Sequence, residues 1–160
     1  MPHLFKEGCT YFVTFCLADA VPDRLKRRRK IEETDSALAI GEHFDVEPSA
    51  GRRILGQPAV ATMVEKSLLH FQGERYALIA WCVMPNHVHV VVTPYGEFSL
   101  SSVLHSWKSF SAHQINENLG SKGKVWQEES FDHLVRHEKA FAEFVAYTES
   151  NPVVARLCVR

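Results

Sequence analysis

The chain lacks the sequence features of a membrane protein or a secreted one. Within its 160 residues, no apolar run reaches the roughly 18 residues that a membrane-spanning helix needs. The first residues, MPHLFKEGCTYF, show no charged start followed by an apolar stretch and a small-residue cleavage site, so we expect no signal peptide. We therefore expect a cytoplasmic protein without a membrane partner.

Cysteine is scarce and scattered. The four cysteines form no Cys-x-x-Cys pair and stand at Cys9, Cys16, Cys82 and Cys158. This spacing argues against a zinc knuckle and against a disulfide framework. A reducing compartment suits such a chain, in agreement with a cytoplasmic setting.

An excess of basic charge is also missing. The formal net charge is −1 at pH 7, whereas nucleic-acid-binding domains usually carry a basic excess. The charge is unevenly placed, however, because residues 24–30 read RLKRRRK. Arg27, Arg28 and Arg29 are therefore candidates for a local contact with phosphates, and the alternative is a solvated loop or helix face.

Composition and residue periodicity favour one folded domain spanning residues 1–160. Hydrophobic residues make up 46% of the chain and charged residues 23%, which allows a sizeable core. We expect strands at 10–17, 75–84, 87–93 and within 124–136, and helices from Pro58 onward, over 99–120 and over 138–150. Residues 18–56 read as a long, partly helical excursion. The order βαββαβα predicts an α+β, ferredoxin-like split βαβ fold with an antiparallel sheet and an added C-terminal helix.

Local signals support the helix assignments. Val60, Val64 and Leu68 recur at helical spacing after Pro58. Ser99 is a suitable N-cap and Gly120 a suitable C-terminal stop for the long helix. Asn151-Pro152 is expected to end the last helix.

Two histidines stand two residues apart in an apolar strand, in the segment MPNHVHVVVTP of residues 84–94. Residues i and i+2 of a strand point to the same face, so His87 and His89 are expected to lie side by side. Two imidazoles on a rigid strand form half of a divalent-metal site. The pair alone is equally compatible with histidines that are hydrogen-bonded within the sheet or that face solvent.

Four segments carry a resemblance to a known family. WCVMPNHVHVVVTP resembles the His-hydrophobic-His motif of single-tyrosine HUH nucleases, and the nearest match is the REP-associated tyrosine transposases. SLSSVLHSWKSFSAHQIN resembles the helix that follows this motif, and VWQEESFDHLVR resembles the Trp-Gln…Phe-Asp segment of the family. FVAYTESNPVVARL resembles its Tyr-x-x-x-Asn-Pro nucleophile helix. The resemblance covers about residues 11–157 and is loosest over 18–51.

The resemblance implies an HUH transposase-like enzyme that cuts and joins single-stranded DNA bearing a hairpin. Tyr147 would be the nucleophile and would form a 5′-phosphotyrosine link. His87, His89 and Asn151 would bind a divalent metal, Mg²⁺ or Mn²⁺. Tyr147 and Asn151 are four residues apart, so on a helix they share one face, as the chemistry requires. Relatives include monomers and homodimers, so either state is expected here.

Other residues have two interpretations each. Lys108 and Arg136 are candidates for contacts with DNA phosphate, with plain solvation as the alternative. Trp107 is expected in the core. His133 and His137 flank the last predicted strand and are weaker candidates for a place near the site, and Glu143 is expected to be solvated.

Two further hypotheses of function remain open from the sequence. The chain ends soon after the nucleophile helix, whereas many family members continue, so a domesticated relative that binds structured single-stranded DNA without cutting it is the alternative. A ferredoxin-like RNA-binding module is a third possibility and predicts an aromatic platform on the sheet face.

Overall fold

The computed structural model describes residues 8–20 and 52–154. Four strands form the sheet: β1 (Tyr11–Cys16), β2 (Tyr76–Val83), β3 (His87–Pro94) and β4 (Phe131–Leu134). The helical elements are the short η1 (Ile54–Gly56), α3 (Pro58–Leu69), α4 (Leu100–Leu119) and α5 (Glu138–Val154).

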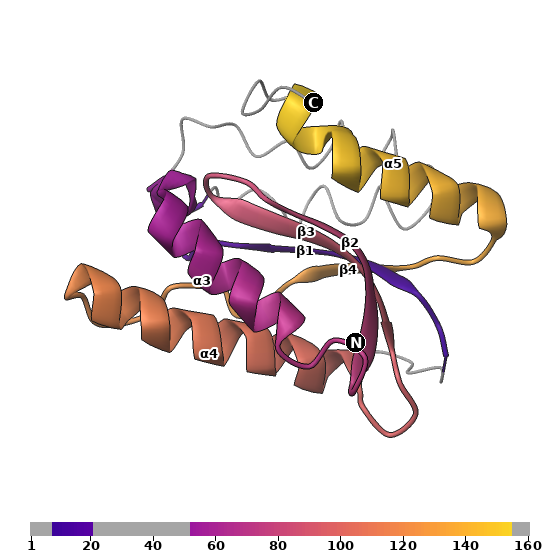
Figure 1. Ribbon diagram of the computed structural model, residues 1–160, viewed down its shortest axis with the longest axis horizontal. Helices are drawn as coiled ribbons and strands as arrows, with labels where there is room; N and C mark the ends of the chain where they lie inside the picture. Colours follow the sequence, from indigo (N-terminus) through magenta and orange to yellow (C-terminus); the bar gives the residue numbers. More distant parts are fainter. Residues whose placement is uncertain (1–7, 21–51, 155–160) are drawn as a thin grey trace.

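The sheet is antiparallel with the strand order β2-β3-β1-β4. Strand β3 lies between β1 and β2, and β1 lies between β3 and β4, which is the split βαβ arrangement. The predicted α+β fold with an added C-terminal helix is therefore confirmed. Helices α3 and α4 cover one face of the sheet and α5 covers the other (Figure 1).

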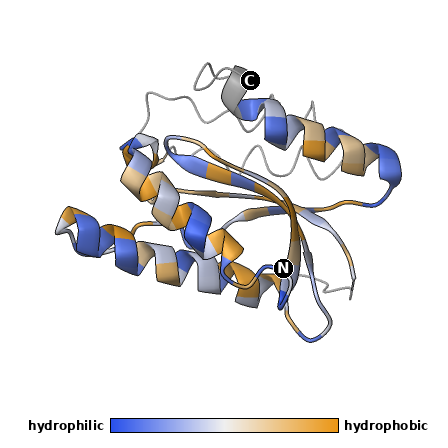
Figure 2. Ribbon diagram, viewed as in Figure 1, coloured by the Kyte–Doolittle hydropathy of each residue, from blue (hydrophilic) through white to orange (hydrophobic). Residues whose placement is uncertain are grey.

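The larger part of the core lies between the sheet and the α3–α4 layer. Alternate residues of the two central strands point into it, and the largest side chains there include Phe15, Tyr76, Trp107 and Trp126. Trp107 is only 1% exposed, so its predicted place in the core is confirmed. Hydrophobic colour follows the strands in Figure 2, whereas α4 and α5 alternate hydrophilic and hydrophobic bands along their length.

A smaller apolar cluster lies under α5. It is formed by Phe12, Ala80, Val91, Phe131, Ala140 and Phe144. The rings of Phe12 and Phe144 stack with their centroids 4.7 Å apart, which joins β1 to α5. Because strand side chains alternate between faces, β1 and β3 each contribute one set of residues to this cluster and the other set to the larger core.

The predicted ends of α4 are confirmed. The Ser99 hydroxyl accepts a hydrogen bond from the backbone N–H of Ser102 at 3.0 Å. Gly120 ends the helix with a φ of 60°, a left-handed conformation that glycine adopts without steric penalty.

The predicted end of the last helix is wrong. Helix α5 runs through Asn151 and Pro152 to Val154. Proline lacks the N–H that would bond the carbonyl four residues earlier, so near a helix end it removes only one hydrogen bond. The buried stripe Ala140, Phe144, Thr148 and Asn151 packs toward the sheet and favours the continued helix.

Part of the sequence prediction lies outside the described residues. This applies to most of the 18–56 excursion, to Arg27, Arg28 and Arg29, and to Cys158. Cys9, Cys16 and Cys82 are thiols rather than disulfides. In the part of the chain that is described, no helix is both long and apolar enough to cross a membrane.

Candidate functional site

A short hairpin between β2 and β3 sets the position of the histidine strand. The backbone N–H of Met84 donates to the carbonyl of His87 at 2.8 Å and closes the turn that contains Pro85 and Asn86. The carbonyl of Pro85 accepts from the N–H of Leu55, and the carbonyl of Asn86 accepts from the N–H of Leu17. The start of β3 is thereby fixed to both η1 and the end of β1.

His87 and His89 point to the same face of the sheet, as the i, i+2 spacing predicts. Their ring centroids are 4.6 Å apart, and their two Nε2 atoms are 3.0 Å apart. Both side chains are buried, with 3% and 0% of their surface exposed. Buried imidazoles need polar partners. Here the two rings face each other through their Nε2 atoms.

Helix α5 places Tyr147 over this pair. The ring of Tyr147 contacts the ring of His89 edge to face, with centroids 5.4 Å apart, and the ring of Phe12 at 5.9 Å. Asn151 lies one turn further along α5 and is 6% exposed. Because α5 is helical through Asn151, Tyr147 and Asn151 share a helix face, and this face lies toward the sheet.

The donor set fits a divalent ion. Two nitrogen ligands about 2.1 Å from one ion at a right angle are about 3.0 Å apart, which is the separation of the two Nε2 atoms here. Across residues 8–20 and 52–154, no cluster of three or more His, Cys, Asp or Glu side chains is arranged to hold a metal. An ion at the histidine pair would therefore need oxygen from another residue type, and Asn151, buried on α5, is of a type that carries an amide oxygen.

Sequence reasoning missed two residues of the site. The Thr14 hydroxyl lies 2.7 Å from Nδ1 of His89, and the Asn86 side-chain oxygen lies 2.7 Å from Nδ1 of His87. Asn86 stands directly before His87 in the motif, so its sequence position was a usable signal. Thr14 had no such signal, because only the β1–β3 register places it opposite His89.

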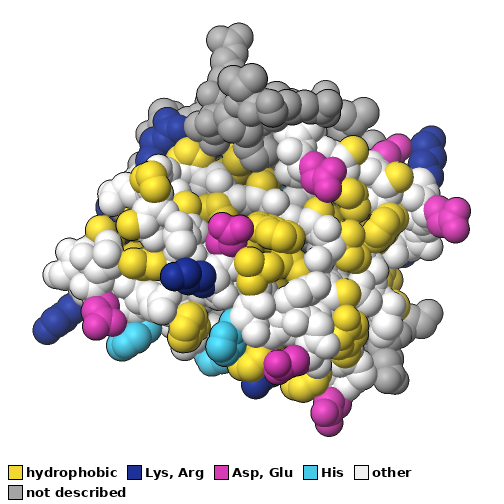
Figure 3. All heavy atoms as spheres, in the orientation of Figure 1, with side chains coloured by type: hydrophobic (Ala, Val, Ile, Leu, Met, Phe, Trp, Pro, Cys, Tyr) yellow, Lys and Arg dark blue, Asp and Glu magenta, His cyan; other side chains and the backbone are white. Residues whose placement is uncertain are grey.

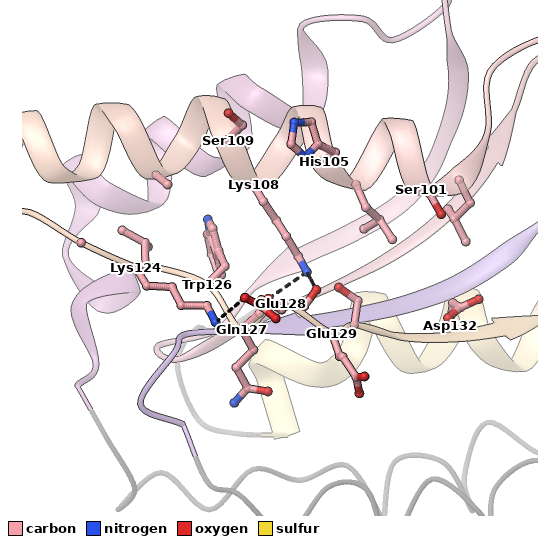
Figure 4. A pocket seen from close by; sticks show the side chains of 16 residues that line it. Ser101, His105, Lys108, Ser109, Lys124, Trp126, Gln127, Glu128, Glu129 and Asp132 are labelled. Atoms are coloured by element: carbon pink, nitrogen blue, oxygen red, sulfur yellow. Dashed lines mark hydrogen bonds and ion pairs between the residues drawn. The ribbon is translucent and has the colours of Figure 1, made fainter. Parts of the chain in front are cut away.

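Lys108 is not part of this cluster. It lies on α4, on the other side of the sheet, at a pocket with a volume of about 710 Å³. Its ammonium donates to the carbonyls of Gln127 at 3.0 Å and Glu128 at 3.2 Å, and Figure 4 shows the side chain reaching from α4 to this segment. Burial lowers the pKa of Lys108 from 10.5 to about 8. The ammonium is thus bound to backbone carbonyls rather than simply solvated, and its contact with DNA phosphate stays a prediction.

The remaining predicted residues lie around the start and the middle of α5. Arg136 is exposed in the connection between β4 and α5. His137 is exposed, and its Nδ1 accepts from the N–H of Ala140 at 3.2 Å at the start of the helix. His133 is buried under α5 against Phe144, with ring centroids 5.4 Å apart. Glu143 is half-buried, one turn before Tyr147.

No broad basic surface appears on the face in Figure 3. Lys and Arg side chains are dispersed there among Asp and Glu side chains. The sequence is similarly balanced, with 18 basic and 19 acidic residues. Any contact with nucleic acid on this face must therefore depend on a few placed groups rather than on a strong overall field.

Comparison with known proteins identifies the family. Residues 52–147 match the family model described as "Transposase IS200 like". The chain belongs to this transposase family. The matched segment runs from the residues before η1 to Tyr147 and includes both histidines, so the family resemblance inferred from the motifs is confirmed.

Individual relatives agree with this assignment. The chain is 29% identical over 93 residues to the REP-associated tyrosine transposase of Escherichia coli K12. The matched stretch covers 57% of this chain and 53% of that protein. It thus spans about half the length of this relative.

Two solved structures show the same fold. A REP-associated tyrosine transposase bound to a REP hairpin superposes with a TM-score of 0.64 at 20% identity, over 97% of this chain and 73% of that one. A candidate transposase from Deinococcus radiodurans superposes with a TM-score of 0.51 at 15% identity, over 94% and 95% of the two chains.

Proposed function

We propose that this member of the transposase family is a metal-dependent endonuclease and strand transferase for single-stranded DNA that bears a hairpin. The observation that carries the proposal is the placement of Tyr147 over His89, whose Nε2 lies 3.0 Å from Nε2 of His87. The hairpin as partner follows from the solved relative, which is bound to a REP hairpin. The protein is proposed to act as a monomer or a homodimer.

Tyr147 is the proposed nucleophile. Its Oη attacks a backbone phosphorus, the bond from that phosphorus to the 3′ oxygen breaks, and a 5′-phosphotyrosine link forms. The phenolic proton is lost on attack, and the leaving 3′ oxygen takes up a proton to become a hydroxyl. The reverse reaction on another strand joins the DNA and restores the tyrosine.

His87, His89 and Asn151 are the proposed ligands of Mg²⁺ or Mn²⁺. A divalent ion supplies charge neutralisation at the scissile phosphate. The two rings are held on a central strand, which limits their movement and would hold a phosphate at a constant position relative to Tyr147. The imidazole ligands favour Mn²⁺ more than Mg²⁺, which prefers oxygen.

The sheet does not offer the open aromatic platform of an RNA-binding module. Phe12 and Phe131 are the aromatic residues of the relevant sheet face, and they are 0% and 5% exposed under α5. Bases cannot stack on rings that a helix covers, so this hypothesis has no support in the described residues.

A covalent-adduct assay tests the proposed function. The protein is incubated with a labelled library of single-stranded DNA hairpins and Mn²⁺ or Mg²⁺, then denatured and separated by size. We expect a labelled adduct with the wild-type protein, none with a chelator present, and none with Tyr147→Phe.

Tyr95→Phe is the matched control. Tyr95 lies just after β3, is 39% exposed and is the next tyrosine after the histidine pair along the chain. The variant removes the same phenolic oxygen as Tyr147→Phe does. Adduct formation by Tyr95→Phe at the wild-type level is expected. If Tyr147→Phe formed the adduct and Tyr95→Phe did not, the nucleophile would be Tyr95.

A further inference from the structure

Two hydrogen bonds hold the outer nitrogens of the histidine pair. In the β1–β3 register Thr14 stands directly opposite His89, and its hydroxyl lies 2.7 Å from Nδ1. The Asn86 oxygen lies 2.7 Å from Nδ1 of His87. Thr14 and His89 are 0% exposed and Asn86 is 2% exposed, so these contacts are shielded from water.

The chemistry of the atoms fixes the direction of these bonds. An amide oxygen only accepts, so Nδ1 of His87 carries its ring proton and donates it to Asn86. With both rings neutral, Nε2 of His87 is then an acceptor, and Nε2 of His89, 3.0 Å away, donates to it. Nδ1 of His89 is left as an acceptor and receives the hydroxyl proton of Thr14. The result is one chain of donors that runs from Thr14 through His89 and His87 to Asn86.

We propose that Thr14 and Asn86 are positioning residues that prepare the two histidines to bind a divalent ion. This inference rests on the proposed function, because it takes the ion to bind between the two Nε2 atoms. Asn86 holds His87 permanently with its Nε2 lone pair directed inward. Thr14 does the same for His89 in a reversible way, since a hydroxyl both donates and accepts.

The reversal balances without a change in charge. For both Nε2 atoms to present lone pairs, the proton of His89 must leave Nε2 and a proton must occupy Nδ1. The Thr14 hydroxyl then turns and accepts from Nδ1–H. Each ring stays neutral before and after, so the exchange is a change of tautomer. A group that only accepted at position 14 would fix the bound form, and a group that did neither would remove the hydrogen bond from position 14 to Nδ1 of His89.

Manganese affinity measures the first consequence. Free Mn²⁺ is followed by electron paramagnetic resonance during titration of the purified protein without DNA. We expect Thr14→Val, which keeps the shape and removes the hydroxyl, to weaken the Mn²⁺ affinity by about 10- to 100-fold. Thr14→Ser restores a hydroxyl and should stay within about 3-fold of wild type. Asn86→Leu should weaken binding by an amount similar to Thr14→Val.

Thr10→Val is the matched control. Thr10 precedes β1 and shares a 2.7 Å hydrogen bond with the hydroxyl of Thr93, away from the histidines. The variant therefore loses a comparable hydroxyl contact, and its Mn²⁺ affinity should equal that of wild type. Equal affinity of Thr14→Val and wild type would overturn the inference while leaving the metal site intact. A wild-type protein that does not bind Mn²⁺ would instead contradict the proposed function and this inference together.

Histidine tautomers give a readout that needs neither a variant nor activity. In nitrogen-15 spectra of the metal-free protein, the proton of His87 should be on Nδ1 and the proton of His89 on Nε2. Saturation with Mg²⁺ should move the His89 proton to Nδ1 and leave His87 unchanged. A metal-free His87 with its proton on Nε2, or a His89 tautomer that does not change with Mg²⁺, would overturn the inference even if Thr14→Val fails to fold.

Discussion

The two faces of the sheet differ in what they bury. Under α3 and α4 the buried groups are mainly large apolar side chains, and the polar atoms among them bond to one another, as Nε1 of Trp107 does to the Tyr76 hydroxyl at 2.9 Å. Under α5 a small apolar cluster borders a set of buried polar side chains, namely His87, His89, His133, Thr14, Thr148, Asn86 and Asn151.

Strand β3 serves both faces. Val88 and Val90 point into the larger core, and His87 and His89 point toward α5. A pleated strand allows this because neighbouring side chains alternate in direction. Under the proposed function, stability and chemistry are divided between the faces, so that changes on one face should leave the property of the other nearly untouched.

The largest expected effect on stability comes from Trp107→Ala. Trp107 is 1% exposed and contacts Phe15 and Tyr76, so its loss leaves a large cavity and should lower the free energy of unfolding by about 3–5 kcal/mol. Denaturant unfolding measures the change. Folded Trp107→Ala should still form the DNA adduct.

Tyr147→Phe is the counterpart on the other face. It should change the free energy of unfolding by less than about 1 kcal/mol, since the ring and its contacts with Phe12 and His89 are kept. Two results together would contradict the division between the faces. Folded Trp107→Ala would form no adduct, and Tyr147→Phe would lower the free energy of unfolding by as much as Trp107→Ala does.

An intermediate effect is expected from Lys108→Met. The Lys108 amino group links α4 to the carbonyls of Gln127 and Glu128, to which it donates in its charged and in its neutral form, and its removal should lower the free energy of unfolding at pH 9. Burial lowers the pKa of Lys108 to about 8, whereas the unfolded chain keeps a value near 10.5. Between these values the unfolded state binds more protons, so wild type should gain stability relative to Lys108→Met as the pH rises from about 8 to 10.5.

Lys124→Met is the control for this pH dependence. Lys124 forms an exposed ion pair with Glu128 at 3.4 Å, which should contribute little. Its stability difference from wild type should change much less over the same range of pH, because Lys124 is only the smallest of the causes that act on the pKa of Lys108. Hairpin binding by Lys108→Met should match wild type, because Lys108 lies across the sheet from the histidines, and a large loss of binding would show that the α4 face also contacts DNA.

The smallest effect is expected from Ser99→Ala. The Ser99 hydroxyl caps α4 by accepting from the N–H of Ser102, and its loss should lower the free energy of unfolding by about 1 kcal/mol. Thermal unfolding measures this change. Ser102→Ala is the companion variant, since its hydroxyl donates only to the carbonyl of Ser99 and the cap itself remains. A decrease for Ser102→Ala as large as that for Ser99→Ala would argue against the cap.

Local sequence signals predicted the elements well because each has a local cause. The order of strands and helices, the Ser99 cap and the Gly120 stop all depend on residues close in the chain. The end of α5 was missed because burial of Thr148 and Asn151 outweighs the local effect of Pro152.

The site was predictable only in part. The shared face of His87 and His89 follows from strand geometry alone and is confirmed. Thr14 could not be found, because its contact with His89 depends on a pairing between residues 75 positions apart. The bonds of Lys108 to the carbonyls of Gln127 and Glu128 could not be found either, because they join residues about twenty positions apart, and its contact with DNA stays a prediction.

The most direct test of the central claim is the identity of the residue that carries the DNA. The adduct is digested with nuclease and then with trypsin, and the modified peptide is found by mass spectrometry. Cleavage after Lys139 and Arg156 yields a peptide in which Tyr147 is the single tyrosine. We predict the nucleotide remnant on this peptide, at Tyr147. A remnant on the peptide of residues 76–108, which contains Tyr76 and Tyr95, would contradict the account.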